Sequence, residues 1–164
     1  MNKDKLEKAV FGAGCFWHVE LEFSKVNGVK GTRVGYMGGD DKKYSNPSYE
    51  MVCSDKTGHA EVVEVTFDPK KVKYEKLLDV FWKNHDPTQL NRQGPDVGTQ
   101  YRSVIFYYTE KQKEEAIMSR DYLQKKLGPK RKIVTQIVKA NEFHLAEEYH
   151  QKYLGKKGLD YCRI

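Results

Sequence analysis

A cysteine stands where a short strand is expected to end and a helix to begin. Residues 7–11 form an extended run, and the residues after Cys15 show the apolar spacing of an amphipathic helix. The apolar positions of that helix are Phe16, Val19, Phe23 and Val26. This strand–turn–helix junction constrains the fold to one that combines helices with a sheet, and it predicts that Cys15 lies at a helix N-terminus.

The position of Cys15 favours a chemical role. Unpaired N–H groups and the positive end of the helix dipole stabilise an anion, and the thiolate is the nucleophilic form of cysteine. The alternative is that Cys15 is a small core residue beside Phe16 and Trp17. Gly12 and Gly14 weigh against it, because tight strand-to-helix turns expose the residue they carry. The residues alone leave both interpretations open.

Length and composition indicate one domain. With 164 residues and 19.1 kDa the chain can bury one full core, so we expect a single catalytic domain over residues 1–164, with 155–164 as a C-terminal tail. The N-terminal residues do not resemble a signal peptide, and no run of 18 apolar residues occurs. We therefore expect a cytoplasmic protein that does not contact a membrane.

Cysteines and charges exclude several classes. Cys15, Cys53 and Cys162 are far apart and form no C-x-x-C pair, which argues against a zinc ribbon and against a disulfide scaffold. Lys and Arg exceed Asp and Glu by 29 − 23 = 6, with basic residues gathered over 125–132. Such a cluster is more often a solvated face than a nucleic-acid site, so we expect no nucleic-acid partner.

The remaining chain alternates strand and helix patterns. After the first helix we expect a strand at 29–36, a polar loop at 38–47, a strand at 60–67, a helix at 74–85, a long loop at 86–100, a strand at 101–108, a helix from a capping box at Thr109 and Gln112 to Leu127, a strand at 133–138 and a short helix at 145–154. The order predicts a ferredoxin-like (split βαβ) α+β sandwich of two layers, with a mixed, mainly antiparallel sheet, extra C-terminal elements and a mobile tail.

A carboxylate on the 60–67 strand is a second candidate for chemistry. The alternation of side chains places Glu61 on the same face as Val63, Val65 and Phe67. A desolvated carboxyl has a raised pKa and can act as a general acid near neutral pH. The first residue of a strand can also lie at a wet rim, and the alternation does not decide between the two.

Five segments together resemble the A-type peptide-methionine sulfoxide reductases, which act on the S epimer of methionine sulfoxide. They are GCFWHVE from Gly14, VGYMGG from Val34, NPSYEMVCSDKTGHAEVVEV from Asn46, FWKNHDPTQLNRQGPDVGTQYRSVIFY from Phe81 and AEEYHQKYL from Ala146. The similarity runs nearly from end to end, and the combination of motifs is far more specific than any one of them.

The resemblance implies a role for each matched residue. Cys15 is the nucleophile, Phe16 and Trp17 form the pocket for the substrate methyl group, and Glu61 is the acid. Tyr49 and Tyr101 hydrogen-bond the sulfoxide oxygen, and Asp96 belongs to the surrounding polar network. The reaction leaves a sulfenic acid on Cys15, and no metal or organic cofactor is implied.

Recycling is expected to use the tail. A second thiol condenses with the sulfenic acid, and an external dithiol such as thioredoxin reduces the disulfide. Cys162 is the one cysteine of the tail, so it is expected to pair with Cys15; Cys53 is interpreted as structural. The implied substrates are oxidised proteins and free methionine sulfoxide, and a monomer is expected because no heptad pattern is visible.

Two other function classes are alternatives to the reductase. An RNA-binding ferredoxin-like domain would leave Cys15 and Glu61 without a task, and TQYRSVIFYY does not reproduce the aromatic signature of that class. A cysteine peroxidase would share the sulfenic acid but would need no methyl pocket. Turnover with methionine sulfoxide and with hydrogen peroxide separates these alternatives.

Overall fold

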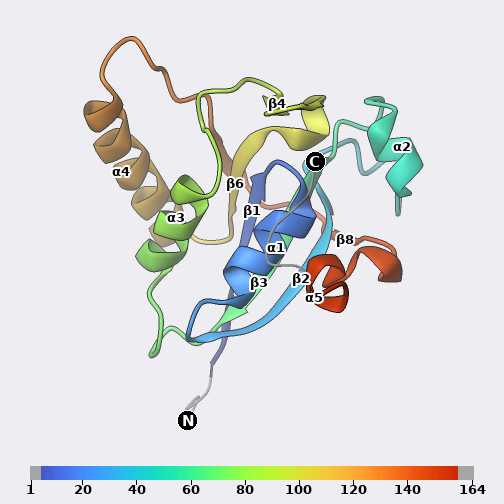
Figure 1. Ribbon diagram of the computed structural model, residues 1–164, viewed down its shortest axis with the longest axis horizontal. Helices are drawn as coiled ribbons and strands as arrows, with labels where there is room; N and C mark the ends of the chain where they lie inside the picture. Colours follow the sequence, from blue (N-terminus) through green and yellow to red (C-terminus); the bar gives the residue numbers. More distant parts are fainter. Residues whose placement is uncertain (1–4, 159–164) are drawn as a thin grey trace.

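A six-stranded mixed sheet forms the centre of the protein (Figure 1). The computed structural model describes residues 5–158, so Cys162 and most of the predicted tail lie outside the described part. The strands of the sheet lie in the order β7-β6-β1-β3-β2-β8. Their bounds are β1 Glu7–Ala13, β2 Val29–Met37, β3 Ala60–Phe67, β6 Ser103–Tyr107, β7 Gln136–Lys139 and β8 His144–Leu145. Pairing is antiparallel except between β6 and β7, so the predicted mixed, mainly antiparallel α+β architecture is confirmed.

The central strands are buried because both of their faces carry apolar side chains. β1 pairs with β3 on one edge and with β6 on the other, and its residues from Ala9 to Ala13 are buried. Gly12 fits there because a Cβ atom would lie 2.7 Å from Val104 Cγ1. A larger residue would therefore displace the end of β1, the strand that leads to Cys15.

Helices cover one face of the sheet. α1 (Phe16–Ser24), α3 (Tyr74–Lys83) and α4 (Glu110–Leu127) share a hydrophobic core with the sheet side chains on that face. A smaller cluster, formed by Val10, Met37, Ala60, Val62, Val104 and Phe106, lies on the other face and is covered by Ala140 and Phe143. In Figure 1, α3 and α4 lie at the left of the view, and α2 (Tyr49–Cys53) and α5 (Tyr153–Lys156) lie at the right.

Thr109 caps α4 as the sequence predicts, but the reciprocal bond of the capping box is shifted by one residue. Thr109 Oγ1 accepts a hydrogen bond from the Gln112 N–H at 3.1 Å, and Gln112 Oε1 accepts from the N–H of Tyr108 and not from that of Thr109. The helix ends at Gly128, whose φ of 82° is in the left-handed region that glycine adopts without cost.

The predicted helix at 145–154 is wrong. The segment instead contains β8, a 3-10 turn η2 (Glu148–His150) and the short helix α5. Its polar side chains replace the hydrogen bonds of a helix with bonds to other elements: the Gln151 side chain pairs with both the N–H and the C=O of Val34. Lys152, with φ of 52°, then interrupts any continuous helix.

Other boundaries differ by smaller amounts. The strand expected at 101–108 begins at Ser103, because Tyr101 belongs to a 3-10 turn, η1 (Thr99–Tyr101). The strand expected at 133–138 lies at Gln136–Lys139, and the loop 86–100 contains a hairpin of β4 (Arg92–Gln93) and β5 (Asp96–Val97).

The sequence prediction did not include α2, which Ser48 caps by accepting from the Met51 N–H. Among residues 5–158, no helix has the length and apolar character needed to cross a bilayer.

Candidate active site

Cys15 lies directly before the first residue of α1, as the junction predicts. β1 ends at Ala13, and Gly14 turns the chain with a φ of 92°. A Cβ atom on Gly14 would also lie 2.8 Å from the side chain of Gln93 on β4, so the turn is closely packed. Cys15 is partly exposed, and its carbonyl accepts from the Val19 N–H in the first turn of α1. The thiol is therefore held at a helix N-terminus with access to solvent.

Glu61 is buried beside this helix start. The residue is 2% exposed, and its carboxyl lies close to the Phe16 N–H and to the Tyr101 hydroxyl. Burial, reinforced by the nearby charge of Asp96, raises the pKa of Glu61 to about 8, although these two donors act to lower it. Its Oε2 atom has no hydrogen-bond partner among residues 5–158. The alternation of β3 left the burial of Glu61 undecided, and the structure places the carboxyl in the interior and in its protonated form at neutral pH.

Tyr101 and Tyr49 extend the network from Glu61 toward the surface. The Tyr49 hydroxyl lies close to the Tyr101 hydroxyl and to the Cys53 thiol, near enough for each to affect its neighbour's pKa. Burial raises the pKa of both tyrosines, and the charge of Glu61 adds to the effect, so each hydroxyl keeps its proton. The two tyrosines, from α2 and η1, therefore present hydrogen-bond donors next to the buried acid.

Asp96 belongs to the same region but does not have the burial of Glu61. It lies on β5, is partly exposed, and has a pKa raised by burial. Its electrostatic effect on the pKa of Glu61 connects it to the network that the sequence predicts.

An aromatic cluster includes the two residues that follow Cys15. Phe16 is buried and Trp17 is partly buried, and both contact His150, with ring centroids at 5.1 and 5.6 Å. The Trp17 Nε1–H donates to His150 Nδ1 at 3.0 Å, and the Trp17 ring stacks on Tyr153 at 3.9 Å. Tyr49 also contacts His150, at 4.6 Å. The imidazole therefore joins three of the predicted site residues.

Sequence reasoning did not find His150. The residue is 1% exposed, and burial lowers its pKa although the charge of Glu147 works in the other direction. The neutral ring accepts from Trp17 at Nδ1 and so carries its proton at Nε2, which has no hydrogen-bond partner in the part of the chain that the structure describes. The signal available in the sequence was a histidine between aromatic residues in AEEYHQKYL, a segment noted for its similarity alone.

Glu147 connects the C-terminal segment to Tyr36 and Tyr49. Its carboxylate accepts from the Tyr36 hydroxyl at 3.0 Å and from the Tyr49 N–H at 3.1 Å. Burial works to raise the pKa of Glu147, but these and further hydrogen bonds outweigh it and hold the pKa below its usual value. An ionised Glu147 thus fixes the start of α2.

Cys53 lies closer to the site than the sequence indicated. It is one helical turn from Tyr49 on α2 and exposed, and its thiol lies close to Tyr49 and to Gln100. Although the residue is exposed overall, partial desolvation of the thiol raises its pKa, so Cys53 has less thiolate at neutral pH than an unperturbed cysteine. The i, i+4 spacing of Tyr49 and Cys53 was the available signal for their contact.

Asp41, His59 and His144 form one group of metal-ligand type within residues 5–158. The candidate ligand atoms lie within 4.8 Å of one another. However, His144 Nδ1 accepts from the Asn46 N–H at 3.2 Å, so the ring proton lies on Nε2 and points at Asp41 Oδ1, 2.7 Å away. His59 Nε2 contacts the same oxygen at 2.8 Å. A metal at His144 Nε2 would place a proton on Nδ1 against the Asn46 N–H, so this arrangement suits a hydrogen-bonded triad.

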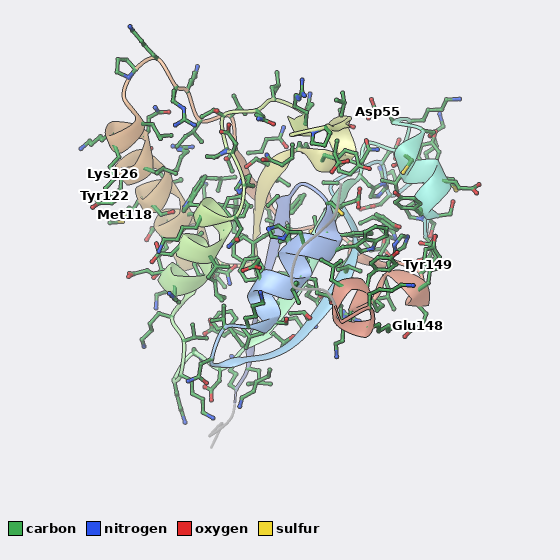
Figure 2. All side chains as sticks on the ribbon, in the orientation of Figure 1. Asp55, Met118, Tyr122, Lys126, Glu148 and Tyr149 are labelled. Carbon is green, nitrogen blue, oxygen red and sulfur yellow. The ribbon has the colours of Figure 1, made fainter. Side chains whose placement is uncertain are left out.

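The structure thus brings together Cys15, Phe16, Trp17, Glu61, Tyr49, Tyr101 and Asp96, and Cys162 lies outside the described residues. The basic cluster lies elsewhere: Figure 2 shows Lys126, Tyr122 and Met118 along α4, away from Asp55 and Tyr149, which lie near α2 and α5.

Comparison with known proteins identifies relatives along nearly the whole chain. The family model described as peptide methionine sulfoxide reductase matches residues 7–164. A protein of Geobacter sulfurreducens named peptide methionine sulfoxide reductase MsrA is 61% identical over 158 residues, which are 96% of each chain. A protein of the same name from Methanothermobacter thermautotrophicus is 60% identical over 98% of this chain and 93% of the relative. The solved structure of Mxr1 from Saccharomyces cerevisiae in reduced form matches with a TM-score of 0.89 and 37% identity, over 96% of this chain and 89% of Mxr1.

Proposed function

Because the chain belongs to the peptide methionine sulfoxide reductase family and reduces methionine sulfoxide to methionine, we propose that Cys15 attacks the sulfoxide sulfur while Glu61 protonates its oxygen. The observation that carries this assignment is the proximity of the buried Glu61 carboxyl to the backbone N–H of Phe16, the residue after the nucleophile. Its pKa of about 8 keeps Glu61 protonated at neutral pH, as a general acid requires.

These two groups supply the electron pair and the proton that the reductase step requires. The Cys15 thiolate donates an electron pair to the substrate sulfur, and the oxygen takes the proton of Glu61. The attack forms a bond between the two sulfur atoms. Transfer of the OH group to the Cys15 sulfur then breaks the S–O bond of the substrate, and the bond between the two sulfurs breaks with its electron pair remaining on the substrate sulfur, which leaves Cys15 as a sulfenic acid. Methionine leaves with its sulfur reduced by two electrons, and Cys15 is oxidised by two.

Tyr49 and Tyr101 assist this step by holding the substrate oxygen. A sulfoxide sulfur becomes electrophilic as its oxygen is hydrogen-bonded or protonated, so donors aimed at the oxygen stabilise the transition state. Each such donor is worth on the order of 3 kcal/mol in comparable sites. The raised pKa values of both tyrosines support this role because they keep the hydroxyls protonated.

Phe16 and Trp17 form the pocket for the substrate methyl group. With the methyl group held there, the oxygen can face Glu61 in one epimer and not in the other. We therefore assign activity toward the S epimer, both in proteins and in the free amino acid. Asp96 acts indirectly, through its contribution to the raised pKa of Glu61.

Recycling requires a second thiol and an external reductant. We propose that Cys162 condenses with the Cys15 sulfenic acid, releasing water, and that thioredoxin reduces the disulfide. Mxr1, which is 37% identical to this chain, has also been solved in complex with Trx2. Thioredoxin-linked repair of oxidised proteins is the physiological role that this sequence of steps supports.

We also propose a ferredoxin-like core formed by β1, α1, β2, β3, α3 and β6. Its support is the all-antiparallel order β6-β1-β3-β2, in which α1 and α3 are the connections between non-adjacent strands. A single catalytic domain over residues 1–164 accords with a sheet that uses strands from β1 to β8. A monomer in the cytoplasm, where thiols stay reduced, completes the proposal.

Comparison of two oxidants tests the function. The protein is supplied with thioredoxin, thioredoxin reductase and NADPH, and turnover is measured with the S and R epimers of methionine sulfoxide and with hydrogen peroxide. Preferred turnover of the S epimer is expected. Equal rates for both epimers would overturn the methyl-pocket assignment, and faster turnover of peroxide would indicate a cysteine peroxidase.

A further inference from the structure

The helix that carries Tyr49 cannot hold its own position. α2 has five residues and lies in the long connection between β2 and β3. An isolated helix of that length is unstable in water, so its placement depends on bonds to other elements. Glu147 holds its first residue through the Tyr49 N–H, as described above.

A second set of contacts joins α2 and the residues after it to η1. Three pairs follow one another: Tyr49 with Tyr101, Cys53 with Gln100, and Asp55 with Thr99. The first pair lies next to Glu61 and the last lies at the surface, where Figure 2 shows Asp55 between α2 and the segment that contains η1. The two segments that supply the site tyrosines are therefore connected along their length.

The outer pair is held by two hydrogen bonds. Asp55 Oδ1 accepts from the Thr99 N–H at 3.2 Å and also from the Thr99 hydroxyl. Hydrogen bonds to an ionised carboxylate are stronger than neutral ones. They fix both the backbone and the side chain of the residue that begins η1.

The backbone of Asp55 limits which residues can make this contact. Its φ of 64° lies in the left-handed region, which glycine adopts most readily and which Asn and Asp tolerate better than other residues. A glycine at this position would relieve the backbone but would lose the bond to Thr99. The exposed aspartate therefore suits both the turn and the contact that holds the two segments together.

We propose that Asp55 and Thr99 are positioning residues that hold the Tyr49 hydroxyl against Tyr101 and thereby set the donors for the sulfoxide oxygen. The inference rests on the proposed function of the two tyrosines. Neither Asp55 nor Thr99 contacts the substrate; both act through the placement of α2 relative to η1.

Four variants of the full chain test the pair by single-turnover release of methionine and by thermal unfolding. Asp55→Gly should lower the rate constant of the reductase step about 5- to 20-fold, with little change in KM, because the tyrosine donors act in the transition state. Its melting temperature should stay within about 3 °C of wild type, because relief of the backbone offsets the lost bonds.

Asp55→Asn keeps an acceptor and tolerates the left-handed conformation, so its rate constant should stay within about 2-fold of wild type. Asn91→Gly is the matched control: Asn91 has a similar φ of 50° and no bond to α2, so its rate should be unchanged.

A double variant separates positioning from a merely structural effect. If Asp55 acts through Tyr49, Asp55→Gly should cause no further loss in a Tyr49→Phe background. A wild-type rate in Asp55→Gly, additive losses in the double variant, or a parallel fall in melting temperature and rate would each overturn the inference. If the wild-type protein fails to reduce methionine sulfoxide, the proposed function fails instead, and the two outcomes are distinct.

Discussion

The carboxyl group of Glu61 lies close to the backbone N–H of Phe16, the residue that follows Cys15, and this N–H acts to lower the pKa of the carboxyl. Glu61 comes from β3 and Phe16 begins α1, so the contact joins the strand that carries the acid to the helix start that carries the nucleophile. The pairing of the strands thus brings together two residues that are far apart in the sequence. The end of β1 is held between β3 and β6, and the chain then turns at Gly14 into Cys15 and α1.

The acid assignment predicts a loss of activity at high pH. With a pKa of about 8, Glu61 should lose its proton and its function above that pH, so the rate of the reductase step in wild type should fall there. Glu61→Gln can still hydrogen-bond the oxygen but cannot donate a proton, so it should be roughly 10²- to 10⁴-fold slower and should lack the fall near pH 8. Single-turnover rates between pH 6 and 9.5 measure both effects. An unaltered rate in Glu61→Gln would assign the acid to a tyrosine or to water.

Burial of Glu61 also predicts a pH-dependent stability. The pKa of Glu61 is raised from 4.5 to about 8 in the folded protein, so folding favours the protonated form. The stabilisation is fully present below about pH 4.5 and is lost as the pH rises toward 8. The free energy of unfolding of wild type relative to Glu61→Gln should fall by up to about 1.4 kcal/mol per pH unit across this window. Urea unfolding at pH 5, 6.5 and 8 checks it, and a constant difference would mean that the carboxyl is hydrated.

His150 is predicted to orient Trp17. His150→Phe keeps an aromatic ring but leaves the Trp17 Nε1–H without its acceptor, so KM for methionine sulfoxide should rise about 3- to 10-fold with a smaller effect on kcat. His150→Asn places an oxygen near the former Nδ1 and should restore most of the affinity. Steady-state kinetics with both variants, and with each combined with Trp17→Phe, measure the coupling. Equal KM values for His150→Phe and wild type would remove His150 from the pocket.

Local patterns predicted the parts of the site that lie on regular elements. The junction around Cys15 was predictable because strand and helix periodicities meet there, and the alternation of β3 placed Glu61 on an apolar face. The short α2 was not, because five residues carry no periodic signal and the helix is held by Glu147 and Thr99 from distant parts of the chain. The helix predicted at 145–154 was also wrong because bonds to a distant strand, such as those of Gln151 with Val34, decide the structure of that segment.

Contacts between side chains that are far apart in the sequence could not be predicted either. His150 receives its hydrogen bond from Trp17, 133 residues earlier, and its sequence position alone does not indicate that partner. The triad of Asp41, His59 and His144 joins three separate segments in the same way. Burial on a face can be inferred from spacing, whereas tertiary hydrogen bonds between loops require the structure.

Cys162 is predicted to be necessary for recycling but not for the reduction itself. Cys162→Ser should release about one methionine per protein in the absence of reductant, as wild type does, and should then fail to turn over with thioredoxin. Coupled NADPH oxidation measures this turnover. Full turnover by Cys162→Ser would transfer the recycling role to Cys53 or to direct reduction of the sulfenic acid, and Cys53→Ser combined with Cys162→Ser decides between these two.

The most direct measurement follows the oxygen atom onto Cys15. Cys162→Ser is mixed with one equivalent of the S epimer of methionine sulfoxide and then with dimedone, which reacts with sulfenic acids, and the protein is digested for peptide mass analysis. We expect about one methionine released per protein and the dimedone adduct on Cys15, with neither product from Cys15→Ser in the same background. Methionine release without modification of Cys15, or release by Cys15→Ser, would contradict the assignment of Cys15 as the nucleophile.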